Sequence, residues 1–208
     1  LLNLKERITQ ICNNCGRNPD DVKLIAVSKR KPASLIKSAY DLGQHDFGEN
    51  TVQEAAKKFE ELSQLNIQWH IIGHLQTNKV KFITNFCNLL HSLDSKKLAD
   101  ALEKRLEFEN KNMDCLIQIN ISKEDSKFGI KPKNIFEFLD YLSDFKRINI
   151  KGLMGMATNT DDKSIIRDDF KRLKEIFDKI NSNQKYHSEI KELSMGMSND
   201  YDIAIEEG

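Results

Sequence analysis

The sequence lacks the features that most quickly place a protein in a membrane, secreted or nucleic-acid-binding class. No run approaches the roughly 20 apolar residues of a membrane-spanning helix, and the N-terminus lacks the apolar core of a signal peptide. The 32 basic and 32 acidic residues leave no formal net charge that would draw the chain to nucleic acid or to a membrane. With 39% hydrophobic residues, we expect a soluble globular protein of the cytoplasm, without nucleic-acid or membrane partners.

Cysteine is also scarce, with four in 208 residues. Cys12 and Cys15 form a C-x-x-C pair, which would suit half of a zinc site or a redox pair, but no second pair follows at the spacing of a zinc finger. The apolar residues around the pair recur at helical intervals, and Gly16 stands where a helix would end. We therefore interpret both cysteines as part of a helix face and expect reduced thiols.

Short runs rich in valine, isoleucine and leucine alternate with longer amphipathic stretches along the chain. This is the pattern of βα units in a parallel sheet. Strands are predicted at residues 23–29, 45–50, 67–73, 88–94, 114–122, 148–158 and 192–198. After an N-terminal helix, further helices are predicted at residues 32–43, 51–64, 77–86, 95–110, 135–142, 170–180 and 199–208, with a polar loop at 123–133.

Seven βα units in one chain without a linker predict a single-domain (β/α)8 TIM-like barrel over residues 1–208, with the eighth strand missing. A seven-stranded barrel leaves unpaired edges on its first and last strands, which proteins avoid or cover. We therefore expect the natural chain to continue beyond Gly208, so that this sequence is truncated at its C-terminus. A doubly wound open sheet remains the alternative architecture, because it needs no eighth strand.

Two sites stand out at the carboxyl ends of the predicted strands, where barrels of this kind place their active sites. Lys29 follows the apolar run 24–27, so its amine is expected at the barrel mouth, partly desolvated, as a Schiff-base lysine requires. Gly196 and Ser198 precede the last helix, where small residues and outward-pointing amides favour a phosphate. Together they suggest a phosphorylated aldehyde, although a solvated lysine and an ordinary turn remain the simpler interpretations.

Other polar residues carry weaker signals. His70 and His74 have the i, i+4 spacing of a zinc pair, but they straddle a strand end and lack the glutamate of the H-E-x-x-H motif, so no metal site is expected. Arg30 and Lys31 are interpreted as solvated loop charges.

A succession of motifs resembles the pyridoxal phosphate homeostasis protein family over nearly the whole chain, in the right order. The motifs are "AVSK" at 26–29, "FGEN" and "QEA" at 47–55, "WHIIGHLQTNK" at 69–79, "HSLD" at 91–94, "QINIS" and "SKFGI" at 118–130, "GLMGM" at 152–156 and "LSMGMSNDYDIAIEEG" at 193–208.

This resemblance implies a barrel of the alanine racemase N-terminal type that binds pyridoxal 5'-phosphate (PLP) as a Schiff base on Lys29. It further implies the following cofactor-binding residues: Asn50, Ser92 and Met154 in the pocket, with His91 beside them, and Gly196 and Ser198 in the phosphate-binding turn. The family's last strand, whose arginine faces the pyridine nitrogen, has no counterpart in the sequence. No catalytic residue and no metal ligand is assigned.

The resemblance also implies a role. In alanine racemase a second domain and the partner subunit supply a second acid-base residue, and a chain of 208 residues has no room for that domain. We therefore expect a protein of PLP (vitamin B6) homeostasis that binds PLP and hands it over to PLP-dependent apoenzymes, as a monomer or weak dimer and without turnover. An amino-acid racemase-like PLP enzyme and a PLP-free barrel with another phosphorylated ligand remain the alternatives.

Overall fold

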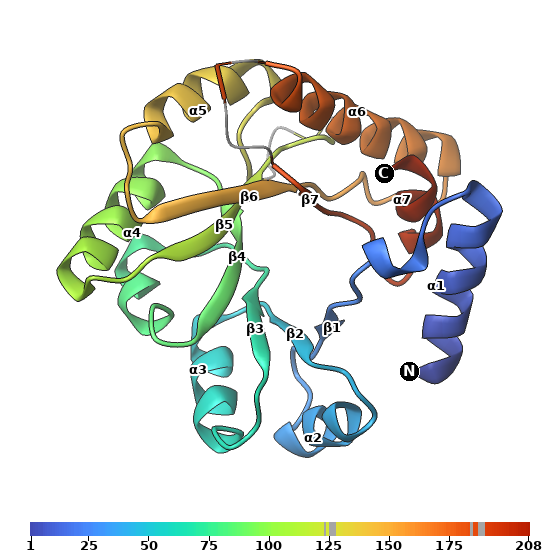
Figure 1. Ribbon diagram of the computed structural model, residues 1–208, viewed down its shortest axis with the longest axis horizontal. Helices are drawn as coiled ribbons and strands as arrows, with labels where there is room; N and C mark the ends of the chain where they lie inside the picture. Colours follow the sequence, from blue (N-terminus) through green and yellow to red (C-terminus); the bar gives the residue numbers. More distant parts are fainter. Residues whose placement is uncertain (123, 125–127, 184, 187–189) are drawn as a thin grey trace.

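Seven parallel strands form one curled sheet in the computed structural model of the protein (Figure 1). The structure describes residues 1–208 except 123, 125–127, 184 and 187–189. The strands are β1 (Ala26–Val27), β2 (Asp46–Glu49), β3 (Gln68–Ile71), β4 (Cys87–Leu93), β5 (Met113–Gln118), β6 (Ile148–Met154) and β7 (Glu192–Ser194). Each strand pairs with the next one along the chain, which confirms the barrel and excludes a doubly wound sheet, whose strand order reverses at a switch point.

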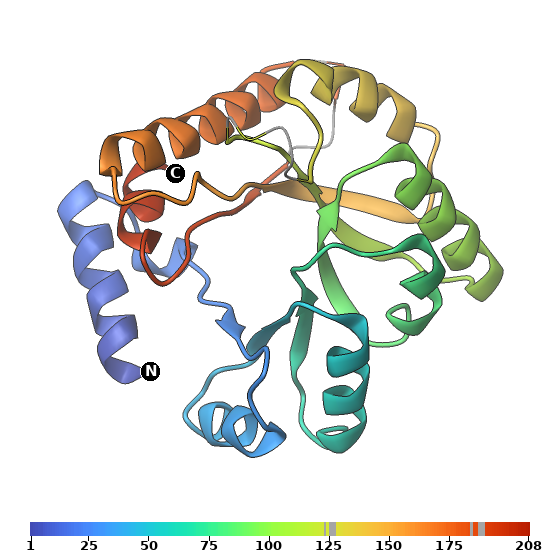
Figure 2. The same cartoon turned by 180° about the vertical axis from the view of Figure 1, so that it is seen from behind.

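Helices cover the outer face of this sheet (Figures 1 and 2). The α-helices are α1 (Leu2–Cys15), α2 (Ala33–Asp41), α3 (Val52–Glu61), α4 (Lys96–Glu109), α5 (Ile135–Leu142), α6 (Lys163–Asn181) and α7 (Tyr201–Glu207). The described residues also contain three short 3-10 helices: η1 (Pro19–Asp21) after α1, η2 (Thr77–Phe82) between β3 and β4, and η3 (Pro132–Asn134) just before α5. None of the helices in the described residues combines the length and the apolarity that crossing a membrane requires.

The helix ends follow from local sequence. The Ser95 hydroxyl accepts a hydrogen bond from Leu98 N at 3.3 Å and so caps α4, whose Leu98, Leu102 and Leu106 are buried. At the end of α1, Gly16 adopts a left-handed conformation with φ of 73°, which glycine tolerates because it has no Cβ. Both ends lie where the sequence predicts them.

Among the residues that the structure describes, the buried apolar side chains form two clusters. The larger cluster contains buried residues of the strands and of the helices that cover the sheet, among them Phe47, Leu90 and Phe170. A smaller one, made of Ile8, Cys12 and Ile205, joins α1 to α7, which Figure 1 shows side by side. Since Cys12 is buried there and both Cys12 and Cys15 are free thiols, the interpretation of the C-x-x-C pair as a helix face is confirmed for Cys12.

Several predicted elements differ from the structure. The strands predicted at 114–122 and 148–158 end at Gln118 and Met154. The strand predicted at 23–29 is only Ala26–Val27, because β1 ends the sheet and has a single neighbour to pair with. Residues 77–86 form a 3-10 helix over Thr77–Phe82 instead of a longer helix, since their aromatic and β-branched residues favour helix weakly. The last strand ends at Ser194, which leaves Gly196 and Ser198 in the following loop. Part of the predicted polar loop, residues 123 and 125–127, lies outside the described residues.

Candidate functional site

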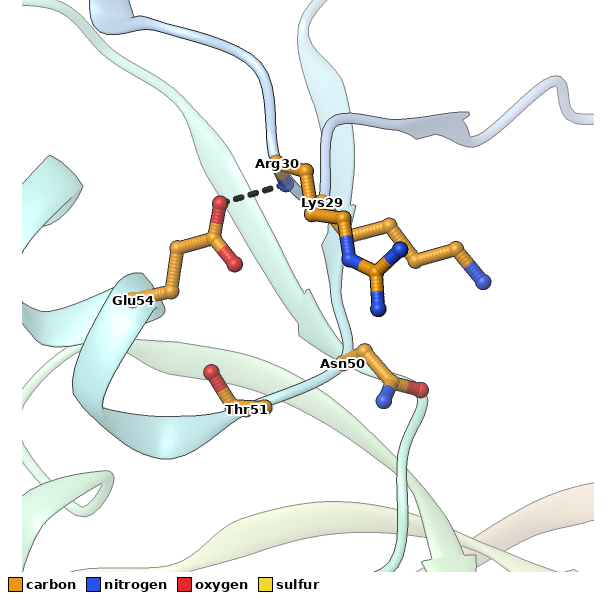
Figure 3. Close-up of a pocket in the computed structure, with 5 residues that line it drawn as sticks. All are labelled: Lys29, Arg30, Asn50, Thr51 and Glu54. Carbon is orange, nitrogen blue, oxygen red and sulfur yellow. Dashed lines mark hydrogen bonds between the residues drawn. The ribbon is translucent and has the colours of Figure 1, made fainter.

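A pocket of about 220 Å³ opens at the carboxyl ends of β1 and β2 (Figure 3). Its lining residues come from the turn after β1 and from the start of α3: Lys29, Arg30, Asn50, Thr51 and Glu54. In Figure 3 the Lys29 and Arg30 side chains extend toward the side where Asn50 lies, and Glu54 stands on the other side of the Arg30 backbone. The pocket therefore brings together two of the predicted site residues, Lys29 and Asn50.

Lys29 is the second residue after β1. Its side chain is exposed, so the expectation of partial desolvation is wrong: β1 is at the end of the sheet, and only β2 flanks it. Among the described residues, no hydrogen bond or ion pair engages the Lys29 amine. An amine without a partner, at the wall of a pocket, is available to an incoming aldehyde.

Arg30, interpreted from sequence as a solvated charge, is exposed but has a special backbone. Its φ is 61°, in the left-handed region that a residue with a Cβ rarely adopts. The Arg30 amide donates to Glu54 Oε1 at 2.6 Å. Arg30 is thus both a wall residue of the pocket and part of a held turn, which the run of three cations in the sequence does not reveal.

Asn50 contacts the ends of the two neighbouring strands. A Cβ added to Gly73 would lie 2.1 Å from Asn50 O and 2.7 Å from its Oδ1, so only glycine fits beside Asn50. The hydroxyl of Ser92, at the end of β4, donates to Gly73 O at 2.7 Å. Asn50, Gly73 and Ser92 therefore form one continuous layer at the carboxyl ends of three strands, and Ser92, fully buried, supports the layer from behind.

The predicted phosphate-binding turn lies after β7, apart from the residues that line this pocket. Gly196 has φ of 81°, and a Cβ there would lie 2.7 Å from the Cβ of Ala204, so the turn packs against α7. Helix α7 begins at Tyr201, and Asp200, the residue before it, accepts from Met197 N at 2.5 Å within the preceding turn. Burial raises the pKa of Asp200. Ser198 is exposed within the turn.

Met154, also among the predicted cofactor-binding residues, is the last residue of β6. Its side chain is buried, and its Cα pairs with Ser194 on β7. It thus lies at the carboxyl end of the sheet, level with the start of the loop that holds Gly196, and does not line the pocket at Lys29.

A chain of hydrogen bonds crosses the barrel interior. Asp46 Oδ1 lies 3.0 Å from His70 Nε2, His70 Nδ1 lies 2.9 Å from His91 Nε2, and His91 Nδ1 lies 2.7 Å from Ser194 Oγ. With both imidazoles neutral, every proton has a place: Ser194 donates to His91, His91 donates to His70, and His70 donates to Asp46. Burial lowers the pKa of His91 to about 3 and also lowers that of His70, where Asp46 opposes the shift.

His74, which the sequence places four residues after His70, contacts a different partner. Its Nδ1 lies 2.7 Å from Asp94 Oδ2, and its ring stacks on Phe128 with the centroids 3.9 Å apart. His70 and His74 therefore do not face a common ligand. Within the described ranges, no three His, Cys, Asp or Glu side chains form a group suited to a metal ion.

Comparison with known proteins adds to this geometry. The family described as alanine racemase, N-terminal domain, matches residues 1–204. The chain is 39% identical over 203 residues to the pyridoxal phosphate homeostasis protein of Aquifex aeolicus, covering 98% of this chain and 88% of that protein.

Solved structures agree. The structure of PipY from Synechococcus elongatus with PLP bound has a TM-score of 0.82 and 32% identity, covering 97% of this chain and 94% of that one. Alanine racemase from Bacillus anthracis has a TM-score of 0.71 at 16% identity, covering 94% of this chain and 50% of that one. At that low identity the second likeness concerns the fold alone.

Proposed function

We propose, from the premise that the chain belongs to the pyridoxal phosphate homeostasis protein family, that it binds PLP and takes part in PLP homeostasis. The observation that carries the assignment of the site is the position of Lys29 and Asn50 in one pocket at the carboxyl ends of β1 and β2. In this proposal the Lys29 amine forms the Schiff base, and residues 1–208 act as one PLP-binding domain.

The residues of the pocket fit such a ligand. PLP supplies an aldehyde that condenses with a primary amine, and a phosphate that needs hydrogen-bond donors. Lys29 offers an amine without a partner in the described residues, and Arg30 and Asn50 add donors on the same pocket wall. The turn at Gly196 and Ser198 is proposed to hold the phosphate, with Ser92 and Met154 in supporting positions behind the site.

The visible absorbance spectrum tests the role of Lys29. After incubation with PLP, the wild type is expected to show the band of a PLP–lysine adduct, and Lys29→Ala is expected to lose it. Lys57→Ala is the matched control, because Lys57 lies exposed on α3 and outside the pocket. A wild type without the band, or a Lys29→Ala variant that keeps it, would contradict the assignment of Lys29 as the lysine that binds PLP.

We further propose that the protein binds and releases PLP without turning over a substrate. The five pocket residues include two groups that can carry a proton, the Lys29 amine and the Glu54 carboxylate. The proposal assigns the amine to the Schiff base, and the carboxylate already accepts from the Arg30 amide and from Lys58. The barrel histidines are each committed to a carboxylate or to one another. A PLP-loaded protein that exchanged the α-proton of an amino acid in heavy water would reinstate the racemase-like alternative.

The cellular setting is part of the same proposal. The protein is proposed to work in the cytoplasm, to pass PLP to PLP-dependent apoenzymes, and to be a monomer or weak dimer. Light scattering of the purified protein tests the oligomeric state, and transfer of the cofactor from loaded protein to an apo-transaminase, measured by recovery of transaminase activity, tests the handover.

A further inference from the structure

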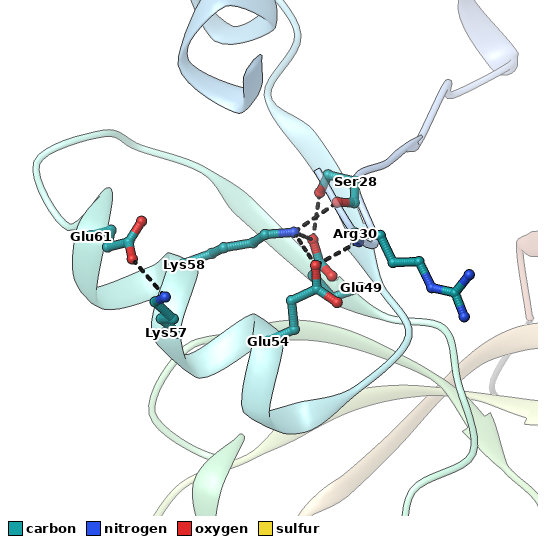
Figure 4. A network of polar contacts seen from close by, with 7 residues as sticks. All are labelled: Ser28, Arg30, Glu49, Glu54, Lys57, Lys58 and Glu61. Atoms are coloured by element: carbon teal, nitrogen blue, oxygen red, sulfur yellow. Dashed lines mark hydrogen bonds and ion pairs between the residues drawn. The ribbon is translucent and has the colours of Figure 1, made fainter. Parts of the chain in front are cut away.

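An ionic network of Lys58, Glu49 and Glu54 contacts the turn that carries Lys29 (Figure 4). Within the turn, Lys31 N donates to Ser28 O at 3.0 Å, so Lys29 and Arg30 are its two central residues. The second central residue, Arg30, has φ of 61°, where such turns usually place glycine or asparagine. This geometry disfavours any residue with a Cβ, so it needs support from the surroundings.

Lys58 gives that support on one side of Lys29. Its side chain, only 7% exposed, reaches from α3 toward β1 and β2. The ammonium Nζ lies 2.7 Å from each of three acceptors: Ser28 O, Glu49 Oε1 and Glu54 Oε1. An ammonium has three N–H donors, and all three are used. One of them ends on the carbonyl immediately before Lys29.

Glu54 gives the support on the other side. One oxygen of its carboxylate accepts from Lys58 and also from the Arg30 amide, the backbone group immediately after Lys29. The pairing with Lys58 lowers the pKa of Glu54, which keeps this carboxylate ionised. The backbone is therefore fixed on both sides of Lys29 by two side chains that are linked to each other.

Glu49 anchors the network from behind. It is fully buried at the end of β2, where its Oε1 accepts from both Ser28 Oγ and Lys58. Replacing a buried ion pair by apolar side chains of similar size often leaves stability unchanged or raises it, so stability alone gives a weak reason for this network. What it does accomplish is to fix the turn that presents Lys29.

We propose that Lys58 and Glu54 are positioning residues for Lys29: they hold the Ser28–Lys31 turn so that the Lys29 amine faces the pocket. This inference rests on the proposed function, because it concerns the reaction of that amine with an aldehyde ligand.

Two ligands distinguish a loss of Lys29 positioning from general damage to the pocket. PLP reacts with an amine, whereas pyridoxine 5'-phosphate has an alcohol in place of the aldehyde and binds without reacting. Glu54→Ala removes the acceptor of both the Arg30 amide and Lys58. We expect the adduct with PLP to form about ten times more slowly in this variant, the effect of losing the charge-assisted hydrogen bond that holds the Arg30 amide. The affinity for pyridoxine 5'-phosphate, measured by calorimetry, is expected to stay or rise, since a negative charge leaves the pocket wall.

Removing Lys58 needs a second design, since Lys58→Met alone leaves Glu49 buried without its cation. The double variant Lys58→Met with Glu49→Gln removes both charges and keeps their volume. It is expected to slow adduct formation by about tenfold or more, again with binding of pyridoxine 5'-phosphate retained. Lys58→Arg, which keeps a cation and donors, is expected to recover part of the rate.

The same helix provides matched controls. Lys57, the residue before Lys58, forms an exposed i, i+4 pair with Glu61, in which Lys57 Nζ lies 3.7 Å from Glu61 Oε1. Figure 4 shows both side chains pointing away from the turn. Lys57→Met and Glu61→Ala are expected to react with PLP as the wild type does.

The outcomes are distinct. A wild type that forms no adduct overturns the proposed function and this inference with it. A wild type that does, with Glu54→Ala and the double variant reacting at the same rate, overturns the positioning role alone. Variants that lose affinity for pyridoxine 5'-phosphate to the same extent as they lose adduct formation with PLP also overturn it, because the pocket as a whole would then be damaged.

Discussion

Ser194 on β7 and His91 on β4 stand 103 residues apart in the chain, yet Ser194 Oγ lies 2.7 Å from His91 Nδ1. The bond spans the interior of the curled sheet and continues through His70 to Asp46 on β2. Four strands are thereby joined by side chains as well as by their backbone ladders. With both imidazoles neutral, each of these three hydrogen bonds has one donor and one acceptor.

Stability is expected to fall in mild acid because of His91. Its pKa of about 3 in the folded protein lies below the usual 6.5, so between these values the unfolded chain binds a proton that the folded chain does not. Stability contributed by the neutral ring is therefore present above about pH 6.5 and is lost as pH falls, by roughly 1.4 kcal/mol per pH unit. Urea unfolding at a series of pH values measures the slope.

The control for this slope is another histidine. His91→Asn is expected to make the dependence on pH shallower, whereas His45→Gln, at an exposed position, is expected to leave it unchanged. A slope that is the same in the wild type and in His91→Asn would contradict the neutral hydrogen-bonded chain. Nitrogen chemical shifts of the wild type at pH 5 give an independent check, since a neutral ring is expected for His91.

Ser198→Ala is expected to weaken the retention of PLP without preventing the adduct on Lys29. A hydroxyl that donates to a phosphate contributes about 1 to 2 kcal/mol, which corresponds to roughly a tenfold faster loss of PLP on dialysis. Ser63→Ala serves as control, because Ser63 is an exposed serine in the turn after α3. If Ser198→Ala retained PLP as well as this control, the phosphate role of the turn would be refuted.

The four thiols are expected to differ sharply in reactivity. Cys15 is exposed, whereas Cys12 and Cys115 are fully buried, and burial raises the pKa of Cys87 to about 12 and that of Cys115 as well. A thiol reagent is therefore expected to modify Cys15 rapidly in the folded protein and all four cysteines in denaturant. Cys15→Ser is expected to abolish the rapid phase. Protection of Cys15 that a metal chelator relieves would instead support the zinc interpretation of the C-x-x-C pair.

The order of strands and helices was accessible from sequence because each rests on a local signal. Alternation of apolar runs with amphipathic stretches indicates parallel strands, since a parallel connection needs a crossover helix. The helix ends at Gly16 and Ser95 depend on one residue each, and the structure confirms both. The length of β1 was not accessible, because the number of residues that pair depends on the neighbouring strand and not on how apolar the run is.

Some residues of the candidate site were likewise accessible from sequence, and others were not. Lys29 and Asn50 meet because parallel strands bring their carboxyl ends to one edge, which a sequence of alternating elements already implies. Lys58 was missed, since a lysine on an amphipathic helix is usually solvated. One signal was present: Lys58 follows buried Ala55 by three residues and so shares its face, whereas Lys57 does not. The left-handed backbone at Arg30 has no signature in the sequence, because arginine does not favour it.

The consecutive strand order has a consequence for how the chain folds. Every strand pairs with the one before it, so each ladder closes a loop of only one βα unit, and the entropy lost at each step stays small. Such a sheet can grow from any pair of adjacent strands. The contacts between distant segments, such as Arg17 with Ile205 O at 2.8 Å and His91 with Ser194, become possible only when the curl is already present. We expect them to form late, so mutations there should speed unfolding more than they slow folding.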